Sequence, residues 1–167
     1  IVRPLLWLVV FAAGFRSVLG IAIQPPYETY ITYDLYVTPG LIGMIALFNG
    51  MQSSLSMVYD RETGSMKLLM TAPISRRLLL IYKLLATATI SSLQAYIFIG
   101  ITILYGVDLP WIGLLTSLPT IFIASYVVAL IGLILASQVK ELENFAGIMN
   151  FVIFPAFFLS SALYPLW

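Results

Sequence analysis

The 167-residue sequence contains no cysteine and no histidine, and only 9% of its residues are charged. The absence of cysteine excludes disulfide bonds, thiolate metal sites and a cysteine nucleophile within this sequence. A soluble domain typically carries about 25% charged residues, so the scarcity of charge argues against one. The sequence is instead apolar, with 61% hydrophobic residues and a mean hydropathy of +1.03. These values predict a protein that resides in a membrane.

Apolar stretches near 20 residues long, separated by short polar segments, are typical of membrane-spanning helices. Backbone groups in lipid must be satisfied internally, which leaves helices or a closed barrel. Barrel strands alternate polar and apolar residues, and the apolar runs of this chain do not alternate. We therefore expect an all-α, polytopic helical bundle forming a single transmembrane domain over 1–167. Five spans are predicted, at 4–22, 39–58, 84–106, 111–136 and 145–159.

The prolines and the ends of the sequence each add an expectation to this arrangement of spans. Pro119 lies inside the fourth predicted span and should kink or divide it, and Pro155 lies inside the fifth. The sequence starts without Met and stops within an apolar run, so we expect it to be a piece of a longer protein, cut at both ends. A sixth span after residue 167 would then complete the bundle.

Basic residues are distributed unevenly among the connections between spans. The connections 24–38 and 107–110 contain no Lys or Arg, whereas 59–83 contains five and 137–144 contains one. A further Arg precedes the first span. Because basic residues favour the cytoplasmic side, we expect the N-terminus and the 59–83 connection to face the cytoplasm.

The connection 59–83 holds seven charged residues of a chain that has only 8 basic and 7 acidic ones. Each charge at a helix centre costs about 2.5–3.5 kcal/mol on insertion scales, so this segment should stay outside the bilayer. Asp60 and Glu62 suit the first turn of a helix, where acidic groups complement the helix dipole. We expect a short helix over 60–70 that docks a cytosolic partner. A plain solvated hairpin is the alternative.

The end of that connection has its own signals. Pro73 should end the short helix, and Ser75 is typical of an N-cap for the helix that leads into the third span.

Polar side chains form one helical stripe on the second span and another on the third. One interpretation is interhelical hydrogen bonding, worth about 0.6 kcal/mol per contact in membranes. The other is the lining of a translocation path, which the amides favour because unpaired amides are costly in lipid. The candidate path residues are Asn49, Gln52, Ser53, Ser56, Thr87, Ser91 and Gln94.

Two further patterns carry predictions. Gly132 and Ala136 are small residues four apart, which predicts a close contact between helices. Tyrosines recur every three residues near the start of the second span, which is typical of an aromatic belt at the headgroup level; a stacking platform for an aromatic or glycan substrate is the alternative. They are Tyr27, Tyr30, Tyr33 and Tyr36.

The stretch that begins at Tyr59, YDRETGSMKLLMTAPISR, resembles the acid-Arg-Glu, Gly, Leu-Leu, Thr-x-Pro-x-Ser signature of type-2 permease subunits of ATP-binding-cassette (ABC) exporters. The Pro-Gly-Leu at 39–41 resembles the Pro-Gly start of that family's second span. The run 155–165 resembles its Pro, Leu-Ser-Gly, Pro run. The sequence departs from the family pattern in having Asp60 where Glu is usual and Ser161 where Gly is usual.

The resemblance implies a function and partners. The chain would be the membrane permease subunit of an ATP-driven export system in a bacterial or archaeal plasma membrane, working as a dimer. The segment 59–83 would be its coupling segment, seated in a groove of an ABC ATP-binding subunit. ATP and Mg would be bound by that partner, so this chain would be neither an enzyme nor a metal or cofactor protein. The implied coupling residues are Tyr59, Asp60, Arg61, Glu62, Gly64, Met66, Leu68 and Leu69.

Residues and motifs that the sequence lacks count against several other functions. No G-x-x-x-x-G-K-[ST] sequence occurs, so the chain has no Walker loop. An ion-coupled secondary transporter usually places acidic residues or His within the membrane, whereas all seven acidic residues lie in or beside connections. An intramembrane enzyme would lack a general base for serine. The charges are too local to indicate nucleic acid. A structural membrane subunit is left open, and no residue specifies the exported substrate.

Overall fold

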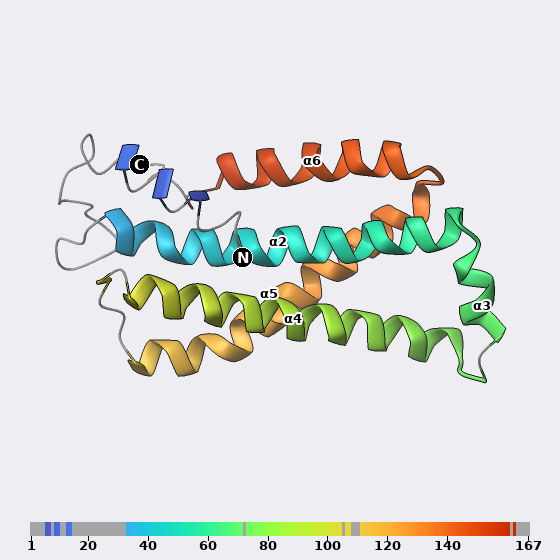
Figure 1. The fold of residues 1–167 in the computed structure, drawn as a ribbon, viewed down its shortest axis with the longest axis horizontal. Coiled ribbons are helices and arrows are strands. Elements are labelled where there is room, and N and C mark those ends of the chain that lie inside the picture. Colours follow the sequence, from blue (N-terminus) through green and yellow to red (C-terminus); the bar gives the residue numbers. More distant parts are fainter. Residues whose placement is uncertain are drawn as a thin grey trace.

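The computed structural model describes residues 6–7, 9–10, 13–14, 33–71, 73–104, 106–107, 111–160 and 162. These residues form four long helices packed in a bundle and a short helix that crosses one end of it (Figure 1). In Figure 1, α2 lies between α6 and α4, and α5 crosses diagonally behind them. The helices are α2 (Tyr33–Glu62), α3 (Ser65–Thr71), α4 (Arg76–Leu104), α5 (Trp111–Gln138) and α6 (Leu142–Phe158).

Helix length and composition confirm the predicted all-α, polytopic bundle. Among the described residues, three stretches are long and apolar enough to cross a membrane, namely Leu35–Glu62, Arg76–Leu104 and Ile112–Gln138. The apolar helix α6 has 17 residues, at the short limit of a spanning helix. The first predicted span, 4–22, lies mostly outside the described residues, so the count of five spans stays a prediction.

The prolines are accommodated within the helices. The helix α2 begins at Tyr33 rather than at the predicted Pro39, because the buried side chains of Tyr33 and Val37 anchor an extra first turn in the core. Pro119 was predicted to kink or divide its span; the helix α5 continues through it, so the span is not divided. Proline is tolerated in a membrane helix where neighbouring groups satisfy the freed backbone.

The prediction of one helix over 60–70 was also wrong. The helix α2 continues to Glu62, and Gly64 follows with φ of 77°, the left-handed conformation in which glycine commonly terminates a helix. The Gly64 N–H donates to the Arg61 carbonyl oxygen at 3.3 Å. Asp60 and Glu62 therefore lie in the last turn of α2, and the separate helix α3 begins only at Ser65.

The start of α4 agrees with the sequence. The helix begins at Arg76, and the Leu78 N–H points to Ser75 Oγ at 3.4 Å. This contact confirms Ser75 as the N-cap.

The core of the bundle is centred on α2, which packs against α4, α5, α6 and α3. One apolar cluster lies far from α3 and joins α2 to Phe98 of α4 and Phe157 of α6. Tyr33 and Tyr36 belong to this cluster and are buried. The belt predicted for them is wrong, because their rings pack inside the bundle; the other two tyrosines of that pattern, at 27 and 30, lie outside the described residues.

A second cluster lies near α3. It consists of the fully buried Val58, Ala136 and Phe145, from α2, α5 and α6. The crossing of α2 and α5 is close: a Cβ added at Gly132 would lie 2.6 Å from Ser54 Oγ. The predicted helix contact at Gly132 and Ala136 is confirmed.

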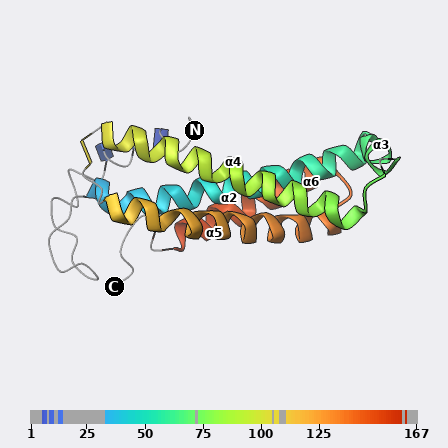
Figure 2. The same cartoon turned by 90° about the horizontal axis from the view of Figure 1, so that it is seen from below.

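The end of the bundle that carries α3 also carries the charge, and we call it the charged end. Figure 2 shows α3 at this end and the N-terminal part of α2 at the other. The connections 59–83 and 137–144, predicted to lie on one side of the membrane, both lie here. The charged residues whose side chains are described all belong to this end: Asp60, Arg61, Glu62, Lys67, Arg76, Arg77, Lys83, Lys140, Glu141 and Glu143. Which side of a membrane this end faces stays a prediction.

Candidate functional site

The helix α3 presents apolar side chains outward at the charged end. Leu68 is 75% exposed and Met70 is 52% exposed, although α3 has only seven residues. The turn before α3 is fixed by hydrogen bonds from Thr63, whose Oγ1 donates to the Tyr59 carbonyl oxygen at 2.9 Å and lies 3.1 Å from Ser65 Oγ. The helix is thus held in place while its apolar surface stays uncovered.

The helix α3 also borders a small apolar cavity, and the partly exposed Met70 contributes to its lining. The cavity has a volume of about 200 Å³ and lies between α3, the end of α2 and the start of α4. Met66, a predicted coupling residue, faces this cavity. The lining residues are Met57, Met66, Met70, Ile74, Arg76, Leu79 and Leu80.

The remaining coupling candidates fall in different places. Leu68 is on the outer surface of α3, Tyr59 is exposed at the end of α2, and Gly64 forms the turn between the two helices. The side chain of Leu69 lies outside the described residues.

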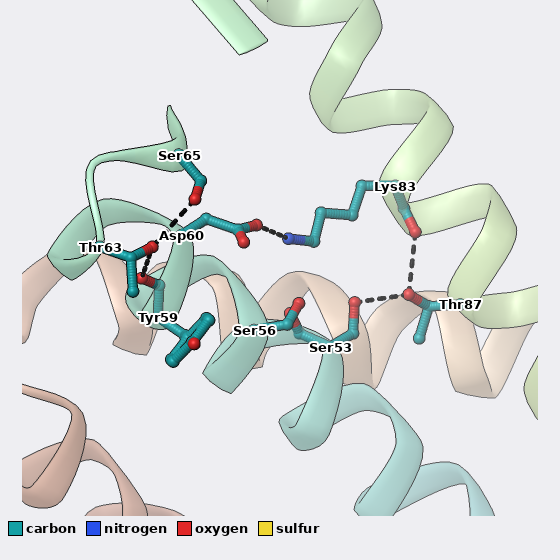
Figure 3. A network of polar contacts seen from close by, with 8 residues as sticks. All are labelled: Ser53, Ser56, Tyr59, Asp60, Thr63, Ser65, Lys83 and Thr87. Carbon is teal, nitrogen blue, oxygen red and sulfur yellow. Dashed lines mark hydrogen bonds and ion pairs between the residues drawn. The ribbon is translucent and has the colours of Figure 1, made fainter. Parts of the chain in front are cut away.

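Asp60 points toward α4 rather than outward. Its Oδ2 accepts a hydrogen bond from Lys83 Nζ at 3.2 Å (Figure 3). Both side chains are about three-quarters buried, at 28% and 24% exposed. This ion pair ties the last turn of α2 to α4.

Arg61 and Glu62 also have partners within the chain. Arg61 Nη1 donates to the carbonyl oxygens of Ala136 at 3.4 Å and Val139 at 3.3 Å, at the end of α5. Glu62 Oε2 accepts from the Leu142 N–H at 3.3 Å, at the start of α6. The sequence placed these charges at the right end of the bundle, but no local signal in it identified backbone groups some 75 to 80 residues away as their partners.

Five of the seven candidate path residues form hydrogen bonds between helices. Asn49 Nδ2 donates to Gln94 Oε1 at 2.9 Å and lies 3.4 Å from Ser91 Oγ. Ser91 is joined in turn to Ser125 of α5 at 3.0 Å. Ser125 is fully buried, and sequence analysis missed it because a lone serine in an apolar span gives no stripe.

The other pair of the network lies closer to the charged end. Thr87 Oγ1 lies 2.6 Å from Ser53 Oγ and 2.8 Å from the Lys83 carbonyl oxygen (Figure 3). For Asn49, Ser53, Thr87, Ser91 and Gln94, the structure therefore supports the interpretation of interhelical bonding.

The two remaining path candidates behave differently. Gln52 and Ser56 are exposed on α2, although this stretch of α2 has the length and hydropathy of a membrane span. The Ser56 hydroxyl donates a hydrogen bond to the Ser53 carbonyl oxygen at 2.7 Å. The amide of Gln52 is thus presented on the outer surface of an apolar helix.

No group of three or more His, Cys, Asp or Glu side chains suited to a metal ion occurs among the described residues.

A model of the ABC-2 type transporter family matches residues 1–167. The chain belongs to the ABC-2 type transporter family. This assignment confirms the family that the residues from Tyr59 onward indicated.

Curated relatives agree with the assignment. The protein named "Putative transport permease ycf38" of Cyanophora paradoxa is 26% identical over 171 residues, covering 99% of this chain. Its namesake in Porphyra purpurea is 29% identical over 173 residues, covering 100% of this chain. In both cases the chain spans 57% of the relative's length. No solved structure gives a significant match.

Proposed function

We propose that this ABC-2 family chain is the membrane permease part of an ATP-driven exporter, in which two permease copies form the translocation path and a separate ATP-binding subunit supplies the energy. The observation that carries the proposal is the position of α3. A short helix with an exposed apolar surface stands at the charged end of an otherwise membrane-like bundle. Family membership and the printed names of the relatives support the same conclusion.

The helix α3 is the proposed docking surface for the ATP-binding subunit. Exposed apolar surface on a structured helix marks a site of protein or membrane contact, and Leu68 and Met70 supply that surface. The basic residues around α3 favour the cytoplasmic side, where ATP is available. Since the sequence has no Walker loop, ATP and Mg belong to the partner in this proposal.

The translocation path is proposed to follow the exposed surface of α2 around Gln52 and Ser56. An amide facing lipid is costly, so this surface is better explained by a second copy or by a polar path. The hydrogen-bonded residues behind it, such as Asn49 and Gln94, would support the path rather than line it. The export direction and a bacterial or archaeal membrane are proposed from the family resemblance alone, whereas the two relatives come from algae.

The test uses the full-length protein purified from its native membranes. Mass spectrometry would identify a copurifying protein by its Walker sequence. We expect Leu68→Asp to weaken its recovery about tenfold, because a charge in the centre of an apolar interface is costly. Glu143→Ala, an exposed change at the charged end of α6, should leave recovery unchanged. Absence of an ATP-binding protein from the unmodified complex would overturn the proposal.

A further inference from the structure

Three consecutive residues at the end of α2 reach three different helices. Asp60 bonds Lys83 of α4 at 3.2 Å, Arg61 bonds carbonyl oxygens at the end of α5, and Glu62 bonds the first N–H of α6 at 3.3 Å. These residues were assigned to the partner ATPase by family resemblance. Each of them also has a partner on another helix of this chain.

The charges of Arg61 and Glu62 match the helix ends that they meet. The last carbonyls of a helix lack internal partners and carry partial negative charge, whereas the first N–H groups carry partial positive charge. Arg61 meets the end of α5, and Glu62 meets the start of α6. The N-cap residue of α6, Glu141, makes no side-chain capping bond, so the carboxylate of Glu62 supplies the acceptor from another helix.

The packing of α6 shows why such contacts matter. Among the described helices, α3 and α6 each make their main contacts with α2, and neither has an extensive contact with α5 or α4. Beneath the charged residues, Val58 of α2 is buried against Ala136 of α5 and Phe145 of α6. The contacts of Arg61 and Glu62 therefore close the end of an apolar cluster that joins α2, α5 and α6.

We propose that Asp60, Arg61 and Glu62 form an intrachain clamp that makes α4, α5 and α6 follow the end of α2 when α3 is displaced. These are positioning residues: α3 binds the partner, and the clamp carries the movement into the bundle. The Gly64 turn joins the two units. This inference rests on the proposed function, since it assigns the displacement to an ATP-binding subunit seated on α3.

The first experiment tests the clamp in the protein alone. Amide hydrogen exchange is measured over the start of α6 in the full-length protein in nanodiscs. Glu62→Ala should speed exchange there about two- to fivefold, the size of an exposed helix-dipole contact. Glu62→Gln, which keeps an acceptor oxygen, should give a smaller change. Lys67→Ala, an exposed charge change on α3, is the matched control, and an equal effect from it would overturn the clamp.

The second experiment tests transmission in the complex with the ATP-binding subunit. The ATP-binding subunit should copurify with the double variant Arg61→Ala, Glu62→Ala in the same amount as with the unmodified protein. Trapping with ATP and vanadate should alter hydrogen exchange in α6 of the unmodified protein. The double variant should reduce this response by about two- to thirtyfold, the usual range for residues that carry coupling.

The outcomes separate the two proposals. If the double variant loses the ATP-binding subunit as Leu68→Asp does, the residues are interface contacts and the clamp is overturned, while the proposed function stands. If the unmodified protein recovers no ATP-binding subunit, the proposed function fails, and the exchange of α6 in the protein alone still decides whether Glu62 holds that helix.

Discussion

Asn49 of α2 donates a hydrogen bond from its side-chain amide to Gln94 Oε1 of α4 at 2.9 Å, within the span region of the bundle. Each side chain thereby supplies a polar partner for the other, at a part-buried site inside stretches that have the length and hydropathy of membrane spans. The bond also joins two helices, α2 and α4, that diverge toward α3 (Figure 1), so its loss should affect the fold rather than a binding step.

Replacing Asn49 with Leu should lower the stability of the bundle by about 1 kcal/mol, because Gln94 keeps an amide that has lost its partner. Thermal unfolding in a fixed detergent measures the change. Replacing both Asn49 and Gln94 with Leu should cost less than the sum of the single changes. Gln52→Leu, an exposed amide on the same helix, serves as the control. A larger loss for Gln52→Leu than for Asn49→Leu would contradict the assignment of Asn49 as a structural residue.

The close crossing of α2 and α5 predicts a second stability effect. A Cβ at Gly50 would lie 2.7 Å from Val128 Cγ1 and 3.0 Å from the Ala129 backbone nitrogen. Gly50→Ala should therefore destabilise the protein by about 1–3 kcal/mol through overpacking. Gly43 lies on the same helix with nothing within 4 Å of an added Cβ, so Gly43→Ala should be neutral or stabilising. Equal melting temperatures for the two variants would count against this crossing.

The fold class could be predicted from the sequence because the features that indicate it are averaged over many residues. A mean hydropathy of +1.03 over 167 residues does not depend on any single contact, and the small pair at Gly132 and Ala136 reports helix packing directly. The boundaries of the helices were harder to predict from the sequence than the fold class. Burial of Tyr33 and Tyr36 extends α2 past Pro39, and that burial depends on Phe157, far along the chain.

The candidate site was predictable in position but not in partners. The charges of 59–83 identified the end of the bundle where α3 lies. The side chains of Arg61 and Glu62 form hydrogen bonds with backbone groups of α5 and α6. Nearly every residue carries the same backbone groups, so the sequence does not indicate which of them will be the partner. Periodicity likewise predicted the stripe that holds Gln52, but it could not distinguish a side chain on the outer surface from one turned toward Gln94.

The turn between α2 and α3 should depend on glycine at position 64. Its φ of 77° costs a residue with a side chain about 1–2 kcal/mol. Gly64→Ala should favour continuation of α2 into α3 and so displace the exposed Leu68. Gly64→Asn should be tolerated better, since Asn adopts this conformation more readily. Limited proteolysis of the 59–75 segment would report the change, and identical cleavage in Gly64→Ala and Gly64→Asn would contradict the expectation.

The ion pair between Asp60 and Lys83 allows a charge-exchange test. Both side chains are less than one-third exposed. The pair should therefore stabilise the folded protein by about 1 kcal/mol, at the upper end of the range for exposed ion pairs. Lys83→Asp alone places two carboxylates together and should lower the melting temperature. Adding Asp60→Lys restores opposite charges across the same gap and should recover much of the loss. Lys67→Asp, the same charge change on the exposed surface of α3, should have little effect on stability. Failure of the exchanged pair to recover stability beyond the Lys83→Asp variant would show that the charged end is held by its apolar cluster rather than by this contact.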